Sequence, residues 1–405
     1  MARRALILIE GTHYNGPLYV QASRRLGLHP ITLSADPAQY NYLSAENVET
    51  IRVDTDNVGA LIRECSQVRA TYDIAGITSA REATCATAGK LCRHFNLPGP
   101  NPESIERCCD KFVQRQLLAR AGVPIPAYRS AMDAREVESY AAEIGLPVVL
   151  KPAAGIGSMG VRLCRNVDEL AAHTSFLLGG KHLWRSSPKI LVEEFVQGPH
   201  YIAEIMGNEV IAIAEAEFGS PPHFVFSEYS FPAPLRHDEY KNIADVSLSC
   251  LRALDLGWGP TCIELRWTDR GPVVIEVNPR MGAGDSQLIQ LAFGVDLITE
   301  HLKLVIGEEC DLRKRHSQTV AVRCLIPDRD GILNWNDDGS RAAAVPGVVD
   351  VKFVVQPKTP IVRKGDYRDH LGSVVALSPS LPQAKAIVRR AADLISWSIT
   401  PFPTE

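Results

Sequence analysis

The chain has 405 residues with a formal net charge of −4, and 45% of its residues are hydrophobic and 22% charged. This length is too great for one ordinary core and predicts two to four lobes of a soluble globular protein. The charge gives no sign of nucleic-acid or membrane binding, and no apolar run is long enough for a transmembrane helix. The ten cysteines form no metal-type CxxC pair, so we expect reduced thiols in a cytoplasmic protein.

Residues 1–100 alternate between strand and helix patterns, which predicts a parallel sheet covered by helices. The opening apolar run ends at Glu10 without a cleavage site, so it is interpreted as a first strand rather than a signal peptide. The turn after it, Gly11–Gly16, is not GxGxxG, and no GxxxxGK[ST] sequence occurs. A dinucleotide fold and a standard P-loop are therefore not expected.

A lysine and a glycine-rich loop follow in the next hundred residues. Asp110 is expected to cap a helix that begins at Lys111, a residue for which a plain surface position is the alternative. A strand ends at Lys151 and runs into AAGIGSMGVRLC, whose Gly155, Gly157 and Gly160 match GxGxxG. Because a second strand follows instead of a helix, we interpret the loop as a flexible flap over nucleotide phosphates.

The segment from Lys189 to Leu254 predicts a strand, a long hairpin, a loop and a helix. KILVEEFV is the strand, and the hairpin turns at Gly207-Asn208. The Pro-rich segment Ser220–Leu235 is expected to be a long functional loop. A helix is expected from about Glu239 to Leu254.

The strongest chemical pattern is the hairpin expected within Cys262–Gly284. Its two strands, CIELRW and PVVIEVN, are joined by a turn at Thr268–Gly271. Pairing would set Glu264 beside Glu276 and Asn278, an oxygen-rich set that suits Mg²⁺. A solvated hairpin is the alternative, but Glu276 interrupts an apolar run, where an unpaired carboxylate is costly.

The remaining sequence predicts a glycine turn, two amphipathic helices and a small α+β lobe from about Cys310. That lobe is expected to begin with the strand TVAVRCLIP and to end with a helix over Leu381–Trp397. We expect domains at 1–110, 111–188, 189–310 and 311–405.

In this order, Lys111, Lys151 with the glycine flap, LVEEFVQG and E…EVNPR resemble the ATP-grasp superfamily of carboxylate–amine ligases. The resemblance covers about residues 1–310 and implies an ATP-grasp fold of α/β and α+β lobes. The tail, with Pro-Gly-Val at 346–348 and Gly-Ser-Val-Val at 372–375, is similar to the C-terminal lobe of the bacterial L-amino-acid ligases, which form dipeptides.

The resemblance implies roles for individual residues. Lys111 and Lys151 would contact ATP phosphates under the flap. In the hinge strand LVEEFVQG, Glu193 and Val196 would flank the adenine, and backbone groups would bind the base. Glu264 and Glu276 would bridge two Mg²⁺ ions, for which Mn²⁺ is an alternative, with Asn278 as a further ligand. Arg280 would bind the substrate carboxylate and stabilise the acyl phosphate, so it is predicted to be catalytic together with Lys151 and Glu276. The nucleotide set is Lys111, Lys151, Gly155, Gly157, Ser158, Met159, Gly160, Glu193, Glu194, Val196 and His200; the substrate set is Glu228, His237, Arg280, Gly282 and Gly284.

Two positions depart from the family pattern. Many members carry a glutamate for the ribose hydroxyls where this chain has His200, whose imidazole can still bond a hydroxyl. Some dipeptide ligases carry a bulky side chain where this chain has Gly284, which suggests a roomier pocket; the alternative is that Gly282 and Gly284 serve the turn.

We therefore expect an ATP-dependent ligase that joins a small carboxylate to an amine, both amino acids or amino-acid-like, in secondary metabolism. It would release ADP and phosphate and act as a homodimer. Glu228 and His237 are candidate bases for the amine, and each is equally a candidate for binding substrate. A carboxylase of the biotin or purine type and a non-catalytic nucleotide-binding protein are the alternatives.

Overall fold

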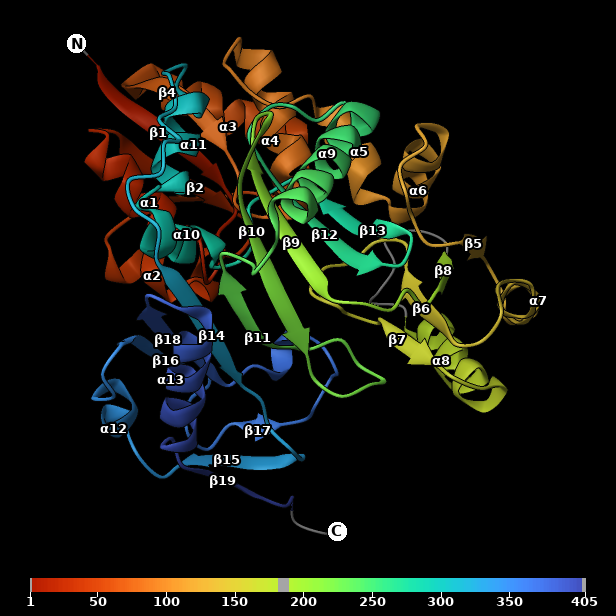
Figure 1. Cartoon of the computed structure of the whole chain (residues 1–405). Coiled ribbons are helices and arrows are strands. Elements are labelled where there is room, and N and C mark those ends of the chain that lie inside the picture. The colour runs from red at the N-terminus through yellow and green to blue at the C-terminus, as the bar shows by residue number, and fades with distance from the viewer. Residues whose placement is uncertain (1, 181–188, 403–405) are drawn as a thin grey trace.

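A computed structural model describes residues 2–180 and 189–402 of the chain. Its strands form four sheets, and the central one has eight strands. In Figure 1 the N-terminal sheet lies beside one end of the central sheet, the C-terminal segment lies below it, and a small lobe projects to the other side. Within the described ranges, no helix is both long enough and apolar enough to cross a membrane.

The N-terminal region is the expected parallel sheet, with strand order β3-β2-β1-β4. Its apolar strands are buried on both faces, as a parallel sheet between helices requires. The elements are β1 (Arg3–Ile9), α1 (Gly16–Arg25), β2 (His29–Ser34), η1 (Pro37–Gln39), α2 (Asn41–Ala45), β3 (Glu49–Arg52), α3 (Val58–Thr71), β4 (Tyr72–Thr78) and α4 (Glu82–Phe95).

Two short helices, α5 (Pro102–Cys109) and α6 (Lys111–Arg120), lead into the small lobe. The Asp110 carboxylate accepts from the backbone N–H groups of Phe112 and Val113, which confirms the predicted start of α6. The lobe is a four-stranded sheet of order β5-β8-β6-β7 with two helices that the sequence analysis did not identify. Its elements are β5 (Tyr128–Ala131), α7 (Ala134–Ile144), β6 (Val148–Pro152), β7 (Arg162–Cys164), α8 (Val167–Gly179) and β8 (Ile190–Glu194).

The position of β8 corrects one expected domain boundary. The expected boundary at 188 separates β8 from the small lobe, yet β8 pairs with both β5 and β6. The residues just before β8, 181–188, lie outside the described ranges. Strand pairing therefore assigns β8 to the small lobe, because the hydrogen bonds of β5 and β6 need it as a neighbour.

The central sheet has the strand order β13-β12-β9-β10-β11-β14-β18-β16, so the C-terminal segment adds three strands to it. The expected C-terminal α+β lobe is thus joined to the central sheet by strand pairing. The sheet and its helices comprise β9 (His200–Met206), β10 (Glu209–Phe218), β11 (Phe226–Phe231), α9 (His237–Leu254), β12 (Pro260–Thr268), β13 (Gly271–Asn278), α10 (Asp285–Phe293), α11 (Leu297–Val305), β14 (Thr319–Leu325), α12 (Ser340–Ala343), β16 (Val348–Phe353), η3 (Tyr367–Asp369), β18 (Gly372–Ser378) and α13 (Leu381–Asp393). A third small sheet is formed by β17 (Pro360–Ile361), β15 (Gly331–Trp335) and β19 (Trp397–Thr400).

Two further expectations about elements are corrected. The expected loop Ser220–Leu235 contains β11, which fills the place between β10 and β14 in the central sheet. The final helix, expected to extend to Trp397, ends at Asp393. Trp397 begins β19, and its ring packs against the ring of Trp335. Both errors have the same cause. These aromatic residues form strands because they pack against neighbouring strands that are distant in the sequence, and the local sequence does not record that packing.

The central sheet separates two apolar cores. One face carries Ile263, Leu265 and Ala203 against α6 and α9. The other face packs on α10 and α11 and, through them, on the N-terminal domain. Side chains that alternate along β9 and β12 therefore point either to a core of α9 or to the junction of the lobes.

Candidate active site

The hairpin of β12 and β13 sets Glu264 directly opposite Glu276 and Cys262 directly opposite Asn278. The expected pairing of the three oxygen ligands is therefore confirmed. Glu264 and Glu276 are partly exposed, while Asn278 is buried. Because opposed side chains in an antiparallel pair lie about 5 Å apart at Cβ, the two carboxylates can share one bound cation.

Lys111 connects this hairpin to the glycine flap. Its Nζ lies 2.8 Å from Glu276 Oε1 and donates to the Gly155 carbonyl at 2.6 Å. Burial opposes the ammonium charge, but Glu276 and Glu82 outweigh it, so the pKa of Lys111 is raised. Burial likewise opposes the charge of Glu276, but Lys111 and Lys151 keep its pKa lowered. The alternative of a surface position for Lys111 is wrong.

Lys151 lies in a second buried ion pair, with Glu193. Lys151 Nζ is 2.6 Å from Glu193 Oε2, and Arg115 Nε is 2.8 Å from Glu193 Oε1. Burial and the Arg115 charge lower the pKa of Lys151 despite Glu193. The carboxylate of Glu193 thus pairs with Lys151 and Arg115, so the backbone of Glu193 is the part that could contact the adenine of a nucleotide.

The flap closes over a pocket that Lys111 and Glu276 also line, together with Gly155, Ser158 and Met159. The space not occupied by protein atoms is about 220 Å³, part of it open to solvent. Gly157, at φ +58°, has no room for a Cβ because the Tyr367 ring lies against it, and the Tyr367 N–H donates to the Gly157 carbonyl at 3.1 Å. Gly160 adopts φ +72° at the end of the flap. The flap is thus held from the C-terminal segment.

The hinge region lies beside β12. Val196 is buried, whereas Glu194 is partly exposed and paired with Arg270 at 2.7 Å. His200 is buried, and its Nε2 lies 3.3 Å from Glu264 Oε2. Neither ring nitrogen of His200 has a hydrogen-bond partner that meets normal geometry, so the imidazole is available to a ligand beside Glu264.

Arg280 follows the hairpin and connects it to the N-terminal domain. Its Nε lies 3.1 Å from Glu82 Oε2, and its Nη2 donates to Asn278 Oδ1 at 3.4 Å. Burial opposes the guanidinium charge, but Glu82 and other anions raise its pKa. Glu82 is the first residue of α4, a position the sequence analysis did not connect with the site.

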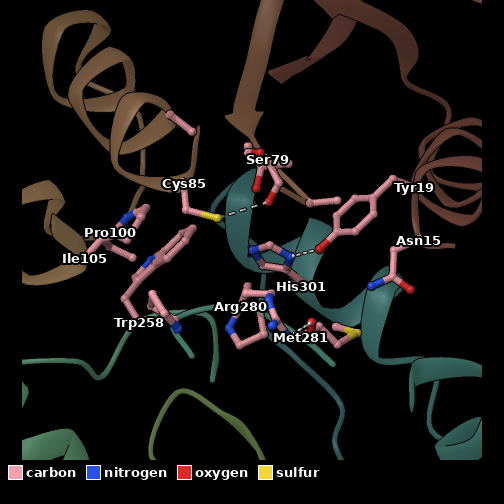
Figure 2. A pocket seen from close by; sticks show the side chains of 15 residues that line it. Asn15, Tyr19, Ser79, Cys85, Pro100, Ile105, Trp258, Arg280, Met281 and His301 are labelled. Atoms are coloured by element: carbon pink, nitrogen blue, oxygen red, sulfur yellow. Dashed lines mark hydrogen bonds between the residues drawn. The ribbon is translucent and has the colours of Figure 1, made fainter. Parts of the chain in front are cut away.

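Beside Arg280 lies a pocket between the N-terminal domain and the central sheet, shown in Figure 2. It has about 450 Å³ of space free of protein atoms, part of it open to solvent. Trp258 and His301 form one side, and His301 Nδ1 lies 2.6 Å from the Tyr19 hydroxyl. Burial lowers the pKa of His301 to about 4, so Arg280 is the charged side chain of this lining.

Two predicted substrate residues do not fit the site. Glu228 is fully buried, but it lies next to Tyr229 in β11, and Tyr229 is in register with His200 through Ala216. Glu228 therefore points to the opposite face of the sheet. There it pairs with Arg389 at 2.9 Å, so its predicted contact with a substrate amino group is wrong. His237 is the exposed first residue of α9, which packs on that same opposite face.

The turn after Arg280 sets the predicted Gly282 and Gly284 beside Asn15, Glu204 and Asp285, which the sequence analysis did not single out. Asn15 donates to the Gly282 carbonyl at 3.2 Å and accepts from the Gly284 N–H at 3.4 Å. Gly282 donates its N–H to Glu204 Oε1 at 3.2 Å, and a Cβ at Gly282 would overlap the Asp285 carboxylate. Gly282 is thus required by close packing, while a Cβ at Gly284 would meet nothing within 4 Å.

Comparison with known proteins identifies the family. Residues 110–313, about half of the chain, match the family described as carbamoyl-phosphate synthase L chain, ATP binding domain. The chain belongs to the ATP-grasp superfamily. It is an ATP-dependent ligase that forms carbon–nitrogen bonds, a carboxylate–amine ligase close to the L-amino-acid ligases.

Residues 323–400 of this ATP-grasp ligase match the L-amino acid ligase C-terminal domain 2. The chain is 63% identical to the uncharacterized protein y4rH of Sinorhizobium fredii, over 99% of this chain and 84% of that protein. It is 25% identical to biotin carboxylase 1 of Populus trichocarpa, over 94% of this chain and 71% of that one. The L-amino acid ligase structure from Bacillus licheniformis matches with a TM-score of 0.83 at 19% identity, covering 99% of this chain and 100% of that one.

The residues of this ATP-grasp ligase fit a magnesium nucleotide. The opposed carboxylates Glu264 and Glu276, with the Asn278 amide, offer hard oxygen donors. Lys111 and the flap backbone line the same pocket and would supply positive charge and N–H donors for phosphate. ATP and Mg²⁺ are bound by this family, and Mg²⁺ supplies charge neutralisation at phosphate oxygens when bound.

The residues that sequence reasoning missed share a physical signature. Glu82 begins a helix after a parallel strand, Arg115 lies one turn into α6, and Glu204 interrupts the apolar strand β9. A charged residue within an apolar strand was the signal used for Glu276, and it would have identified Glu204 as well.

Proposed function

We propose that this ligase activates a small carboxylate with ATP and transfers the acyl group to an amine, joining two amino acids or amino-acid-like compounds. The observation that carries the proposal is the position of Arg280 beside the carboxylates of the hairpin. Arg280 follows β13 and reaches Asn278, while Lys111 pairs with Glu276 and lines a pocket with it and the flap. A carboxylate on Arg280 would thus face the phosphates that Lys111 and the flap hold.

The reaction needs activation because a carboxylate has no leaving group. Phosphoryl transfer from ATP gives an acyl phosphate and ADP, and the amine then displaces phosphate. Arg280 orients the carboxylate by a charge-assisted contact, and Glu82 holds the guanidinium in place at 3.1 Å. Lys111 and the flap N–H groups offset charge on the phosphates, so rate enhancement comes from positioning and electrostatics.

Amino-acid substrates are supported by the C-terminal segment. Its residues 323–400 match the L-amino acid ligase domain, and its Tyr367 touches the flap. The pocket of Figure 2, with Arg280 and mostly uncharged neighbours, would receive the side chain of the carboxylate substrate. Two bridging metal ions, with Mn²⁺ able to replace Mg²⁺, a homodimer, a cytoplasmic location and a role in secondary metabolism complete the proposal.

The test is release of ADP and phosphate from ATP and Mg²⁺ with amino acids supplied singly and in pairs. Turnover that requires two amino acids, with a product mass equal to their sum less water, supports the proposal. Release of AMP and pyrophosphate would contradict the acyl-phosphate route. Glu217→Gln is the control, because Glu217 lies on the opposite face beside Lys385.

A carboxylase that phosphorylates bicarbonate is the second candidate, favoured by the similarity to biotin carboxylase over 94% of the chain. The match of residues 323–400 to the amino acid ligase domain argues against it. ADP release that depends on bicarbonate and needs no amine would replace our proposal with this one.

A further inference from the structure

A second pair of carboxylates lies beside the proposed metal carboxylates. Glu204 of β9 is in register with Cys262 of β12, and Cys262 is in register with Asn278 of β13. The neighbouring row of the same face holds Ile202, Glu264 and Glu276. Glu204 is therefore one row from the metal carboxylates and points to the same face, about 7 Å away along the diagonal.

Asp285 completes the pair from the start of α10. Ligand atoms of Glu204, Cys262 and Asp285 lie within 4.8 Å of one another, and all three residues are buried. Two carboxyl groups this close can form a hydrogen bond to each other only when one of them carries a proton. When both are ionised, Glu204 Oε2 has no donor although it is shielded from solvent.

The strongest electrostatic influences on the pair come from one arginine and from groups that are anionic or neutral, and the Gly282 N–H donates to Glu204 Oε1. Arg280 is the one cation among the described residues that acts on both carboxyl groups, and it is engaged by Glu82. The remaining neighbours are Glu264, the Cys262 thiol and the Tyr229 hydroxyl, none of which supplies positive charge. Because little positive charge offsets the negative charge of this buried carboxylate pair, the pair favours binding a proton or a cation.

Open space adjoins Asp285 at the preceding residue. Gly284 directly precedes Asp285, and a Cβ at Gly284 would meet no atom within 4 Å. A primary ammonium has three N–H donors, which match the unpaired Glu204 Oε2 and the Asp285 carboxylate. An ammonium here would lie one row from the carboxylates of the hairpin, near the acyl group on Arg280.

We propose that Glu204 and Asp285 bind the ammonium group of the amine substrate and accept the proton that it must lose. This inference rests on the proposed function. The ammonium gives one proton to the pair, its nitrogen forms the bond to the acyl carbon, and the bond from that carbon to the phosphate oxygen breaks. A second N–H proton leaves with the phosphate, and the pair returns its own to solvent.

The electrostatics of the pair support this role. Burial, with the neighbouring Asp285, raises the pKa of Glu204 well above its ordinary value. Burial also raises the pKa of Asp285 to about 6, although Glu204 and Arg280 act against it. A pair that holds one proton near neutral pH can take a proton from an ammonium at a useful rate.

The decisive experiment separates amine attack from carboxylate activation. Hydroxylamine is largely uncharged at neutral pH, so it captures an acyl phosphate as a hydroxamate without needing a base. We expect Asp285→Asn to lower amide formation from ATP, Mg²⁺ and amino acids about 100-fold, and hydroxamate formation less than about threefold. Glu204→Gln is the second variant, and Glu217→Gln on the opposite face is the control.

The outcomes distinguish the two proposals. If the unaltered enzyme forms neither amide nor hydroxamate with any amino acid, the proposed function is wrong and this role falls with it. If it forms both and Asp285→Asn loses both equally, or neither, the proton-accepting role is overturned. A stoichiometric transition metal that is lost in Cys262→Ser would also overturn it, because the cluster would then be a metal site.

A second measurement needs no substrate. The pKa of Asp285 is raised from 3.8 in the unfolded chain to about 6 in the folded protein. Its protonation therefore stabilises the fold fully below pH 3.8, and this stabilisation is lost as the pH rises through about 6. The melting temperature of Asp285→Asn, relative to that of the unaltered protein, should therefore rise as the pH is raised from 4 to about 7. Parallel curves for the two proteins would show that Asp285 is ionised throughout and would contradict the shared proton.

Discussion

Two carboxylate pairs on one face of the central sheet differ in their neighbours. Glu276 of the hairpin pair has Lys111 at 2.8 Å, and its pKa is lowered. Glu204 lies beside Asp285, and burial together with that neighbour raises its pKa well above the ordinary value. The hairpin pair is partly exposed and Glu204 is buried, and their cations differ as well, because Lys111 pairs with Glu276 whereas the Arg280 that acts on Glu204 is engaged by Glu82.

One sheet thus holds, one row apart, a carboxyl group of lowered pKa and a carboxyl group of raised pKa. Lys111 reaches Glu276 from the first turn of α6, whereas α10 begins with another carboxylate beside Glu204. In our proposals the same residue types would serve cation binding in one pair and proton exchange in the other.

The largest expected effect is on the hairpin pair. Glu276→Gln should lower ADP release by at least about 10³-fold, because it removes the charge that offsets Lys111 and a metal ligand. Circular dichroism should show an unchanged fold. Arg280→Ala should have a similar effect on turnover, and near-normal activity in either variant would remove the site assignment.

A third acidic site sharpens the comparison from the other face of the sheet. Glu228 is fully buried between Arg323 and Arg389, so Glu228→Gln should destabilise the protein by about 2 kcal/mol. The part of the protein that stays folded should keep its turnover. Thermal melting with activity below the transition checks both. A selective loss of amine affinity would restore Glu228 as a substrate residue.

The flap gives a smaller expected effect on ATP binding. Gly157→Ala places a methyl group against the Tyr367 ring and should raise the KM for ATP about tenfold. Tyr367→Ala in the same chain should recover part of that loss, because it removes the overlap. Additive effects in this double-mutant cycle would mean that the C-terminal segment does not hold the flap.

The smallest effect concerns the pocket beside Arg280. His301 has a pKa of about 4, lowered by burial, so its neutral form adds stability above pH 6.5 that is lost as the pH falls through about 4. His301→Asn should cost about 1 kcal/mol at pH 7 by leaving the Tyr19 hydroxyl poorly paired. Its melting temperature should also vary less between pH 7 and 4 than that of the unaltered protein.

The sequence by itself determined the local structure of the site. The turn Thr268–Gly271 fixes the register of the hairpin, and that register sets Glu264 opposite Glu276. Asp110 fixes the start of α6 and thereby the place of Lys111. These features depend on residues a few positions apart, so spacing was enough to predict them, and the ATP-grasp resemblance supplied their order.

Only the tertiary structure decided which face and which distant partner each charged residue has. Glu228 was misplaced because β11 was not recognised as a strand, and a residue's face follows from its strand register. The carboxylate of Glu193 holds Arg115 and Lys151, two distant partners that the spacing of residues did not indicate. Glu204 and Asp285 are 81 positions apart, and only the packing of α10 against the central sheet brings them together. The pKa values of these two carboxyl groups depend on their burial and on the charges near them, and no local pattern of residues records either factor.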